Sequence, residues 1–223
     1  MPDPVAVRPG AGPTHHEAAL APDLLAGEDQ RLEVVADAAY SSGSCRRALT
    51  AGGHRLLIKP PPLRPAVPGG FTLDDFAIDT AADTAVCPAG QTAYFTGATA
   101  TTGTRRAIFD AATCAACPLR QRCTTTRGGR VVQIRPDHDL QAVARRQAAT
   151  DPVWQDGYRR WRPPVERAVA WVVAGGNRRL RYIGTIKNDA WLHLRAAALN
   201  LRTLVNRGLT RSDDAWVLTA APA

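Results

Sequence analysis

The chain has 223 residues, of which 45% are hydrophobic and 22% charged, with a formal net charge of +8. That length fits one domain, or one domain with an insertion, and the composition excludes collagen-like, fibrous and wholly disordered chains. No apolar run approaches the roughly 20 residues that cross a bilayer, and the N-terminus lacks the pattern of a signal peptide. We therefore expect a soluble, cytoplasmic protein with no membrane partner.

The first predicted elements are a strand, a helix and a second strand. After a short helix over Glu17 to Leu25, residues 32–36 form an apolar strand that ends at Asp37. A helix to about Leu49 follows, and residues 56–58 form the second strand. Such short connections predict a βαβ unit with parallel strands and a right-handed crossover, and we assign residues 1–70 to the first part of an α/β core.

Prolines at residues 60–68 end this pattern, so we place a boundary near residue 70. Residues 71–139 contain four cysteines and little helical periodicity, which predicts a small Cys-rich insert that depends on something other than a large core. Residues 140–209 form the helical second part of the core. Residues 210–223 are expected to be a loose tail.

Two helices are expected in the later half. One begins at Pro163-Pro164, since prolines are tolerated in a first turn, and directs Val165, Val169 and Val172 toward the core. The other spans about Asn188 to Arg207. Its apolar side chains fall on one stripe, namely Trp191, Leu194, Ala198, Leu201 and Val205.

Two carboxylates stand at positions suited to metal chemistry. Asp37 follows an apolar strand, where ligands bind in parallel α/β sheets, and Glu166 lies beside the apolar face of a helix. Paired acids of this kind suit Mg²⁺-dependent phosphoryl transfer. Each acid also has a simpler explanation, because Asp37 could cap a turn and Glu166 could be favoured by the dipole of its helix.

Positive charge is concentrated in residues 101–223, which hold 21 Lys and Arg against 9 Asp and Glu. Nearly all of these cations are arginines, which grip phosphate bidentately and favour a nucleic-acid partner. Biased codon usage and a solvated basic surface are the alternatives. Several arginines surround the cysteines, namely Arg105, Arg106, Arg120, Arg122, Arg127 and Arg130.

Four cysteines have metal-ligand spacing: Cys87, then Cys114-x2-Cys117, then Cys123. A Cys-x2-Cys turn directs two thiolates toward one ion, and two further cysteines can complete a tetrahedral Zn²⁺ site. Reduced thiols and a redox pair are the alternatives, and a disulfide framework is disfavoured because the chain has no export signal. Cys45 lies in the first long helix and is expected to be a small core residue.

These motifs occur in an order that resembles the C-terminal portion of bacterial insertion-sequence transposases of the DDE type. The resemblance covers nearly the whole chain and rests on six segments, namely Val34-Val35-Ala36-Asp37-Ala38-Ala39-Tyr40, Cys87-Pro88-Ala89-Gly90, Cys114-x2-Cys117-Pro118-Leu119-Arg120-x2-Cys123, Arg162-Pro163-Pro164-Val165-Glu166-Arg167, Asn177-Arg178-Arg179-Leu180-Arg181-Tyr182-x-Gly184 and Ala198-Leu199-Asn200-Leu201.

The resemblance implies a partial RNase H-like core, a mixed sheet flanked by helices, with the Cys-rich segment inserted between its second and third catalytic acids. It makes Asp37 the second acid and Glu166 the third, which hold Mg²⁺ or Mn²⁺. The zinc site expected at Cys87, Cys114, Cys117 and Cys123 rests on their spacing and not on the resemblance. Contacts to DNA phosphates are expected from Arg162, Arg167, Arg178, Arg179 and Arg181.

The first catalytic Asp of the family belongs upstream of Asp37, and the chain begins with what resembles the end of the third core strand, Val5-Ala6-Val7. We therefore expect an N-terminally truncated transposase that is inactive alone. The alternative is a non-catalytic DNA-binding remnant that interferes with intact transposase. Expected partners are DNA, intact transposase and the chain itself, and the expected location is the bacterial cytoplasm, on the nucleoid when DNA is bound.

Overall fold

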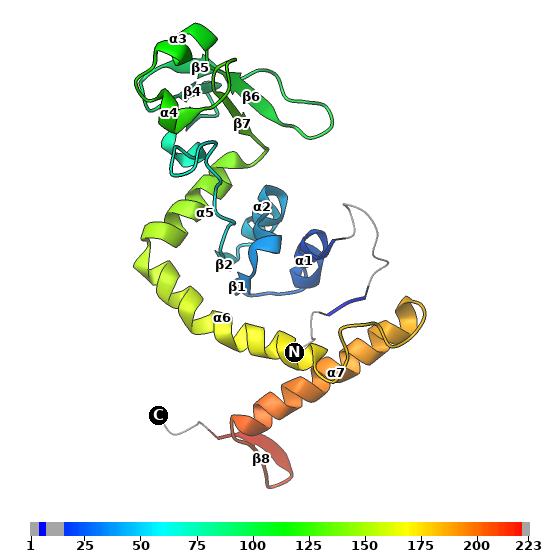
Figure 1. Ribbon diagram of the computed structural model, residues 1–223. Coiled ribbons are helices and arrows are strands. Elements are labelled where there is room, and N and C mark those ends of the chain that lie inside the picture. Colours follow the sequence, from blue (N-terminus) through cyan, green and yellow to red (C-terminus); the bar gives the residue numbers. More distant parts are fainter. Residues whose placement is uncertain (1–4, 8–15, 220–223) are drawn as a thin grey trace. The chain divides into compact units, whose positions relative to one another are not determined.

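The computed structural model describes residues 5–7 and 16–219. The chain forms two compact units. One, here called the helical unit, comprises Met1–Ala36, Leu49–Leu57 and Val153–Ala223. The other, here called the cysteine unit, comprises Asp37–Ala48 and Ile58–Pro152. Helices and several small sheets alternate along the chain (Figure 1), so the predicted mixed α/β class is confirmed.

The first elements follow the predicted order. Helix α1 (Glu17–Leu25) precedes strand β1 (Glu33–Ala36), which is hydrogen-bonded to β2 (Arg55–Ile58) in a two-stranded sheet. Between the strands lie a short 3-10 helix, η1 (Ala38–Ser41), and helix α2 (Gly43–Ala51). The predicted strand, helix and strand are therefore confirmed to within two residues. Val5–Val7, expected as the end of a strand, are not a strand.

Helix α6 (Pro152–Val173) is attached to β2 by Trp154. The indole Nε1 donates a 3.0 Å hydrogen bond to the carbonyl oxygen of Leu56. Trp154 also stacks on Tyr158, with ring centroids 5.2 Å apart and planes inclined by 8°. The side chain of Trp154 is buried, so the contact combines apolar packing with a satisfied indole donor.

The predicted start of this helix at Pro163 is wrong. Helix α6 begins at Pro152 and continues through Pro163 and Pro164 (Figure 1). Each proline removes one backbone donor and crowds the preceding turn. Two aromatic residues four positions apart, the buried Trp154 and the half-buried Tyr158, nevertheless pack along one face before the prolines, and this packing favours a helix that begins further toward the N-terminus. Glu166 therefore lies in the second half of a long helix and not in a first turn.

Helix α7 (Thr185–Asn206) is held on the end of α6 by Arg195. Its Nε donates to the carbonyl oxygen of Val172 at 2.7 Å, and its Nη2 donates to that of Trp171 at 2.6 Å. These bonds satisfy carbonyl groups that have no partner within α6. They also determine which face of α7 is turned toward α6.

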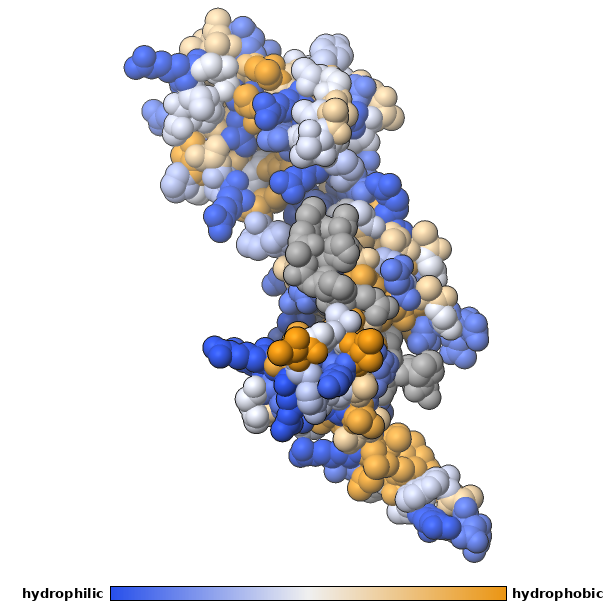
Figure 2. Space-filling model, turned by 90° about the vertical axis from the view of Figure 1, so that its right-hand side faces the viewer, coloured by the Kyte–Doolittle hydropathy of each residue, from blue (hydrophilic) through white to orange (hydrophobic). Residues whose placement is uncertain are grey.

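The expected apolar stripe of α7 does not face the interior. Leu194, Leu201 and Val205 are exposed by 73%, 54% and 55%, and Val169 on α6 is also exposed. Apolar side chains are visible on the surface in the lower part of Figure 2, where Figure 1 places the end of α7. Arg195, together with the buried Asn188 and Ala196, occupies the inner face instead.

The chain then forms a β-hairpin where a loose tail was expected. Strands β8 (Leu209–Ser212) and β9 (Ala215–Leu218) pair antiparallel, with Leu209 opposite Leu218. The two-residue loop, Asp213-Asp214, has φ values of 47° and 63°. Aspartate tolerates this left-handed region, and two such residues match the turn that suits the twist of a hairpin.

The cysteine unit contains two antiparallel sheets. Strands β3 (Ala77–Asp79), β4 (Thr84–Val86) and β5 (Thr92–Tyr94) form one meander, and β6 (Arg105–Ile108) pairs with β7 (Val131–Ile134). A bridge between Phe95 and Ala107 links the two. Shorter helices complete the unit, namely η2 (Leu73–Asp75), α3 (Ala111–Ala116), α4 (Arg120–Cys123) and α5 (His138–Thr150).

These strands build a core of their own. Alternate side chains face inward, so Val132 and Ile134 are buried while Val131 and Gln133 are exposed. The buried cluster consists of Phe76, Ala85, Ala93, Phe95, Ala107, Phe109, Val132 and Ile134, and Cys87, Cys114 and Cys123 pack against it. The expectation that this segment would depend on something other than an apolar core is therefore incomplete.

Candidate functional site

Asp37 stands at the carboxyl end of β1, as predicted, and is exposed. Its backbone is extended, and its Oδ1 accepts a 2.8 Å hydrogen bond from the amide of Ala39, so the side chain caps η1. The capping role proposed as the simpler explanation is therefore present. A cap of this kind fixes the orientation of the carboxylate while leaving it at the surface.

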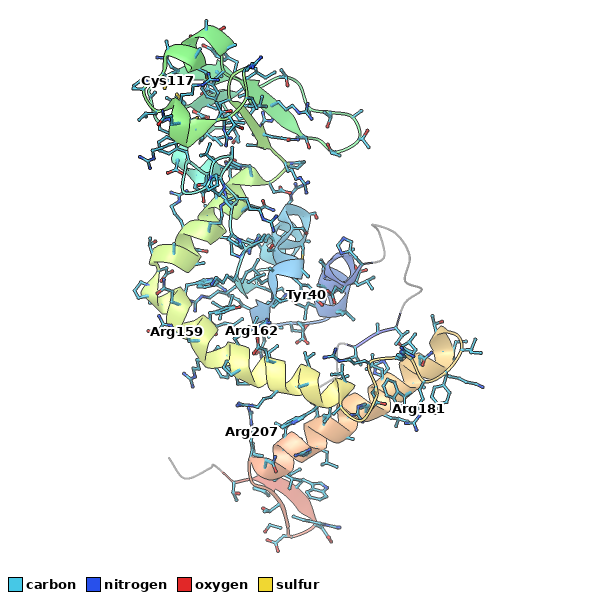
Figure 3. The ribbon with its side chains drawn as sticks, in the orientation of Figure 1. Tyr40, Cys117, Arg159, Arg162, Arg181 and Arg207 are labelled. Carbon is cyan, nitrogen blue, oxygen red and sulfur yellow. The ribbon has the colours of Figure 1, made fainter. Side chains whose placement is uncertain are left out.

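Glu166 and Arg162 form an ion pair along one face of α6. Arg162 Nε lies 2.8 Å from Glu166 Oε1, and the Glu166 side chain is 60% exposed while that of Arg162 is 23% exposed. Residues four apart on a helix are neighbours, so the pair follows directly from the spacing. Arg167 is exposed on the same helix. Arg162 and Glu166 therefore form one charged surface, and Figure 3 shows Arg162 on α6.

The arginine-rich loop between α6 and α7 is organised by Asn188, which the sequence analysis did not identify as a site residue. Asn188 is fully buried. Its Oδ1 accepts hydrogen bonds from the amides of Arg181 and Tyr182 at 3.1 and 3.0 Å. Its Nδ2 donates to the carbonyl oxygens of Tyr182 and Gly184 at 2.7 and 2.5 Å.

The side-chain amide of Asn188 binds the backbone of the loop and leaves the arginine side chains exposed to solvent. Arg178, Arg179 and Arg181 are all exposed, and Figure 3 shows Arg181 beside the beginning of α7. The loop thus presents three cations on a backbone that a buried side chain holds in one conformation. Only an Asn placed one turn into the helix after a glycine could have indicated this from the sequence, and that signal is weak.

All four predicted zinc ligands border one cavity in the cysteine unit. The cavity has a volume of about 130 Å³, and its walls include Cys87, Cys114, Cys117 and Cys123. Cys87 lies in a tight turn, where the amide of Gly90 donates to its carbonyl oxygen at 2.8 Å. Cys114 lies in α3, Cys117 caps that helix, and Cys123 ends α4. All five cysteines of the chain are free thiols, and Cys45 is buried.

Two arginines turn buried donors toward the same cavity. Arg120 and Arg130 both line it, and Arg120 Nη1 and Arg130 Nε are buried atoms without a hydrogen-bond partner in the described chain. A buried donor left unpaired costs about 1–3 kcal/mol, and more when it is charged. Four sulfur atoms and two orphaned donors are consistent with a thiolate-bound cation, because thiolates accept hydrogen bonds.

No preformed metal site is present among the described residues. Across residues 5–7 and 16–219, no group of three or more His, Cys, Asp or Glu side chains is placed to hold a metal ion. The prediction of zinc at the cysteines is therefore not confirmed. Asp37 belongs to the cysteine unit and Glu166 to the helical unit, and their common metal site also stays a prediction.

The remaining arginines around the cysteines differ in their surroundings. Arg105 pairs with Asp83 and lies over the ring of Phe95 at 5.6 Å. Arg122 lies over the ring of Phe71 at 4.6 Å. Arg106, Arg122 and Arg127 are exposed. The basic rim predicted from the sequence is therefore only partly a surface, because Arg120 and Arg130 face the cavity.

A family model described as the transposase DDE domain matches residues 86–205, which is more than half of the chain. The chain belongs to this family. Membership implies action on DNA and the use of a divalent metal. The matched region contains Glu166, the four clustered cysteines and the arginine-rich loop, whereas Asp37 precedes it. Comparison with curated proteins and with solved structures gives no match.

One further observation concerns membranes. None of the described helices combines the length and the apolar character needed to cross a bilayer.

Proposed function

We propose that the chain is part of the catalytic domain of a DNA transposase, with Asp37 and Glu166 as two of the three acids for which the family is named. The observation that carries the proposal is that the family match includes Glu166, whose carboxylate is exposed and paired with Arg162 at 2.8 Å. An exposed carboxylate next to cations can approach both a metal ion and DNA. The β1–α2–β2 segment would belong to an RNase H-like core.

The residues of the chain would divide the chemistry between them. Asp37 and Glu166 would hold Mg²⁺ or Mn²⁺, which when bound activates an attacking hydroxyl and stabilises the leaving oxygen at a DNA phosphodiester. Arg162 positions Glu166 by its ion pair. Arg167 and the loop arginines Arg178, Arg179 and Arg181 would contact backbone phosphates, which set register without reading sequence.

We further propose that the four clustered cysteines hold a structural zinc ion in the cysteine unit. Their shared cavity and the two orphaned guanidinium donors support this assignment. Zinc in such a site contributes to folding and takes no part in the DNA chemistry. Residues 71–139 would then be the insert between the second and third acids, as the order of motifs in the chain suggests.

Strand transfer into target DNA tests the catalytic proposal. The chain is incubated with Mg²⁺ or Mn²⁺ and DNA that carries the terminal inverted repeats, and joined products are counted. The expected inactivity of the chain alone predicts no joining unless an intact transposase is added. Metal-dependent joining that depends on the chain should be abolished by Asp37→Asn and by Glu166→Gln, whereas the exposed Asp29→Asn should leave it unchanged. Joining that survives Asp37→Asn would refute the role given to Asp37.

A second candidate is DNA binding without catalysis, in which the chain associates with an intact transposase and interferes with it. The exposed loop arginines Arg178, Arg179 and Arg181 favour it, because arginines can contact DNA phosphates without a metal ion. Metal-independent binding to a labelled duplex, together with no joining under any metal, would support this candidate over the first.

Salt dependence tests the DNA contacts that both candidates share. The slope of log K against log salt becomes shallower by about 0.9 for each DNA phosphate that the protein no longer neutralises, so we expect a decrease approaching ~2.7 when Arg178, Arg179 and Arg181 are all changed to Gln. The matched control changes three exposed arginines of the cysteine unit, namely Arg64, Arg135 and Arg146. Equal slopes for the two triple variants would exclude the loop as the DNA-binding surface.

A further inference from the structure

The buried donors of Arg120 and Arg130 require acceptors from inside the cysteine unit. Arg120 Nη1 and Arg130 Nε are both inaccessible to solvent and unpaired in the described chain. A DNA phosphate, which arrives from outside, cannot reach them. The groups that line the same cavity therefore supply the candidates.

Two polar side chains of the cavity already have partners. Asp110 Oδ2 accepts from the amide and the hydroxyl of Thr113 at 2.7 and 2.9 Å. Thr124 Oγ1 shares a 3.0 Å hydrogen bond with Thr126. Two further polar side chains of the lining, those of Gln91 and Thr92, are exposed. The four half-buried sulfur atoms are therefore the acceptors best matched to the buried donors, and they accept strongly only as thiolates.

Each of the two guanidinium groups has a further contact that does not use its orphaned donor. Arg120 Nη2 donates to the carbonyl oxygen of Thr126 at 3.1 Å. Arg130 lies over the ring of Phe76, with 5.4 Å from its Cζ to the ring centroid. These contacts hold both side chains in the lining of the cavity.

We propose that Arg120 and Arg130 donate hydrogen bonds to the metal-bound thiolates of the cysteine cavity. The inference rests on the proposed zinc site and adds its outer shell. Four thiols lose four protons to solvent when they bind one divalent cation, which gives a complex of charge −2. The two guanidinium groups offset the charge of that complex.

Cobalt binding to the purified full chain tests both the zinc site and the hydrogen bonds from Arg120 and Arg130 to its thiolates. Cobalt bound by four thiolates absorbs in the visible range, and zinc then displaces it in competition with a chromophoric chelator. We expect one metal per chain. Arg120→Gln and Arg130→Gln should each lower zinc affinity about 10–100-fold, as loss of an outer-shell partner does. Arg127→Gln removes the same charge from an exposed arginine that does not line the cavity, and should bind as the wild type does.

The charge-transfer band separates hydrogen bonding from general destabilisation. A hydrogen bond to a thiolate stabilises its lone pairs, so its loss should move the sulfur-to-cobalt band to longer wavelength in the two cavity variants and not in Arg127→Gln. Wild-type chain that binds no metal refutes the zinc site and the inference with it. Cavity variants that match the wild type in affinity and band position refute the inference and leave the zinc site standing.

Discussion

The guanidinium of Arg46 donates from Nη2 to the backbone oxygen of Ile58 at 2.5 Å, and this bond lies wholly inside the cysteine unit. Its Nε also lies 3.3 Å from the carbonyl oxygen of Ser41. Arg46 is only 4% exposed, and burial lowers its pKa. The hydrogen bonds of the buried Arg46 guanidinium therefore link α2 to the end of β2.

Replacement of Arg46 by Met should lower the free energy of unfolding by about 2–4 kcal/mol, because two carbonyl groups would lose a charged donor. Urea unfolding should show a lower midpoint with an unchanged slope. The neighbouring Arg47 supplies the control, since its side chain is 62% exposed and pairs with Asp137 at the surface. Arg47→Met should cost at most about 1 kcal/mol, and equal losses for the two variants would contradict the prediction.

His138 should make the stability of the cysteine unit depend on pH. Burial, more than the nearby Arg145, lowers the pKa of this imidazole below its ordinary value of 6.5, and Arg105 acts in the same direction while Asp139 and Asp74 oppose it. Below about pH 6.5, His138 therefore binds a proton more readily in the unfolded chain than in the folded chain. Stability is therefore complete above about pH 6.5 and is lost as the pH falls below it, at up to about 1.4 kcal/mol per pH unit.

Unfolding measured between pH 8 and pH 5, a window set by the ordinary histidine pKa, checks this expectation. His138→Gln should flatten the profile over that window, because Gln cannot take up the proton. The exposed His16→Gln should leave the slope of the wild type intact. A profile that His138→Gln does not alter would assign the pH dependence to other groups.

Two adjacent glycines should differ sharply in their tolerance of alanine. Gly129 has a φ of +85°, and a Cβ there would meet the carbonyl oxygen of Phe109, whereas a Cβ on Gly128 would meet nothing within 4 Å. We expect Gly129→Ala to cost roughly 3 kcal/mol or more from strain and overlap together. Thermal unfolding of Gly129→Ala and Gly128→Ala measures the contrast, and equal melting temperatures would be inconsistent with this loop geometry.

Asn188 should matter for both stability and DNA binding. Asn188→Ala removes four hydrogen bonds and leaves the amides of Arg181 and Tyr182 without their acceptor. A loss of roughly 2–3 kcal/mol follows from the unpaired groups. Amide exchange of the loop should accelerate, and the affinity for duplex DNA should fall. Asn206→Ala, at the exposed end of α7, is the control and should change neither.

The local elements of the chain could be predicted where pattern and burial agree. A short apolar run predicts the strand before Asp37, and a short helix is predicted over residues 17–25. The structure confirms both elements. The Arg162 and Glu166 pair also follows from spacing alone. Four cysteines spread over 37 positions of sequence border one cavity, because their turns are encoded locally by Cys-Pro and Gly residues.

The differences at α6 and α7 have another origin. In both helices two interactions compete, and the sequence does not show which of them is stronger. Prolines 163 and 164 indicate a helix start, but the aromatic face that begins at Trp154 outweighs the two missing backbone hydrogen bonds. The apolar stripe of α7 indicates a buried face, yet the hydrogen bonds of Arg195 to the end of α6 turn another face inward. A single polar side chain thus decides which surface of α7 is solvated.

The continuity of α6 has a mechanical consequence for Glu166. Trp154 attaches one end of the helix to the carbonyl oxygen of Leu56, and Glu166 lies about 18 Å further along the same helix at 1.5 Å per residue. A small tilt of the helix about Trp154 therefore displaces the Glu166 carboxylate more than it displaces residues near Trp154. Pro163 and Pro164 lie between the two and remove two backbone hydrogen bonds, so the position of Glu166 depends on how easily the helix bends at these prolines.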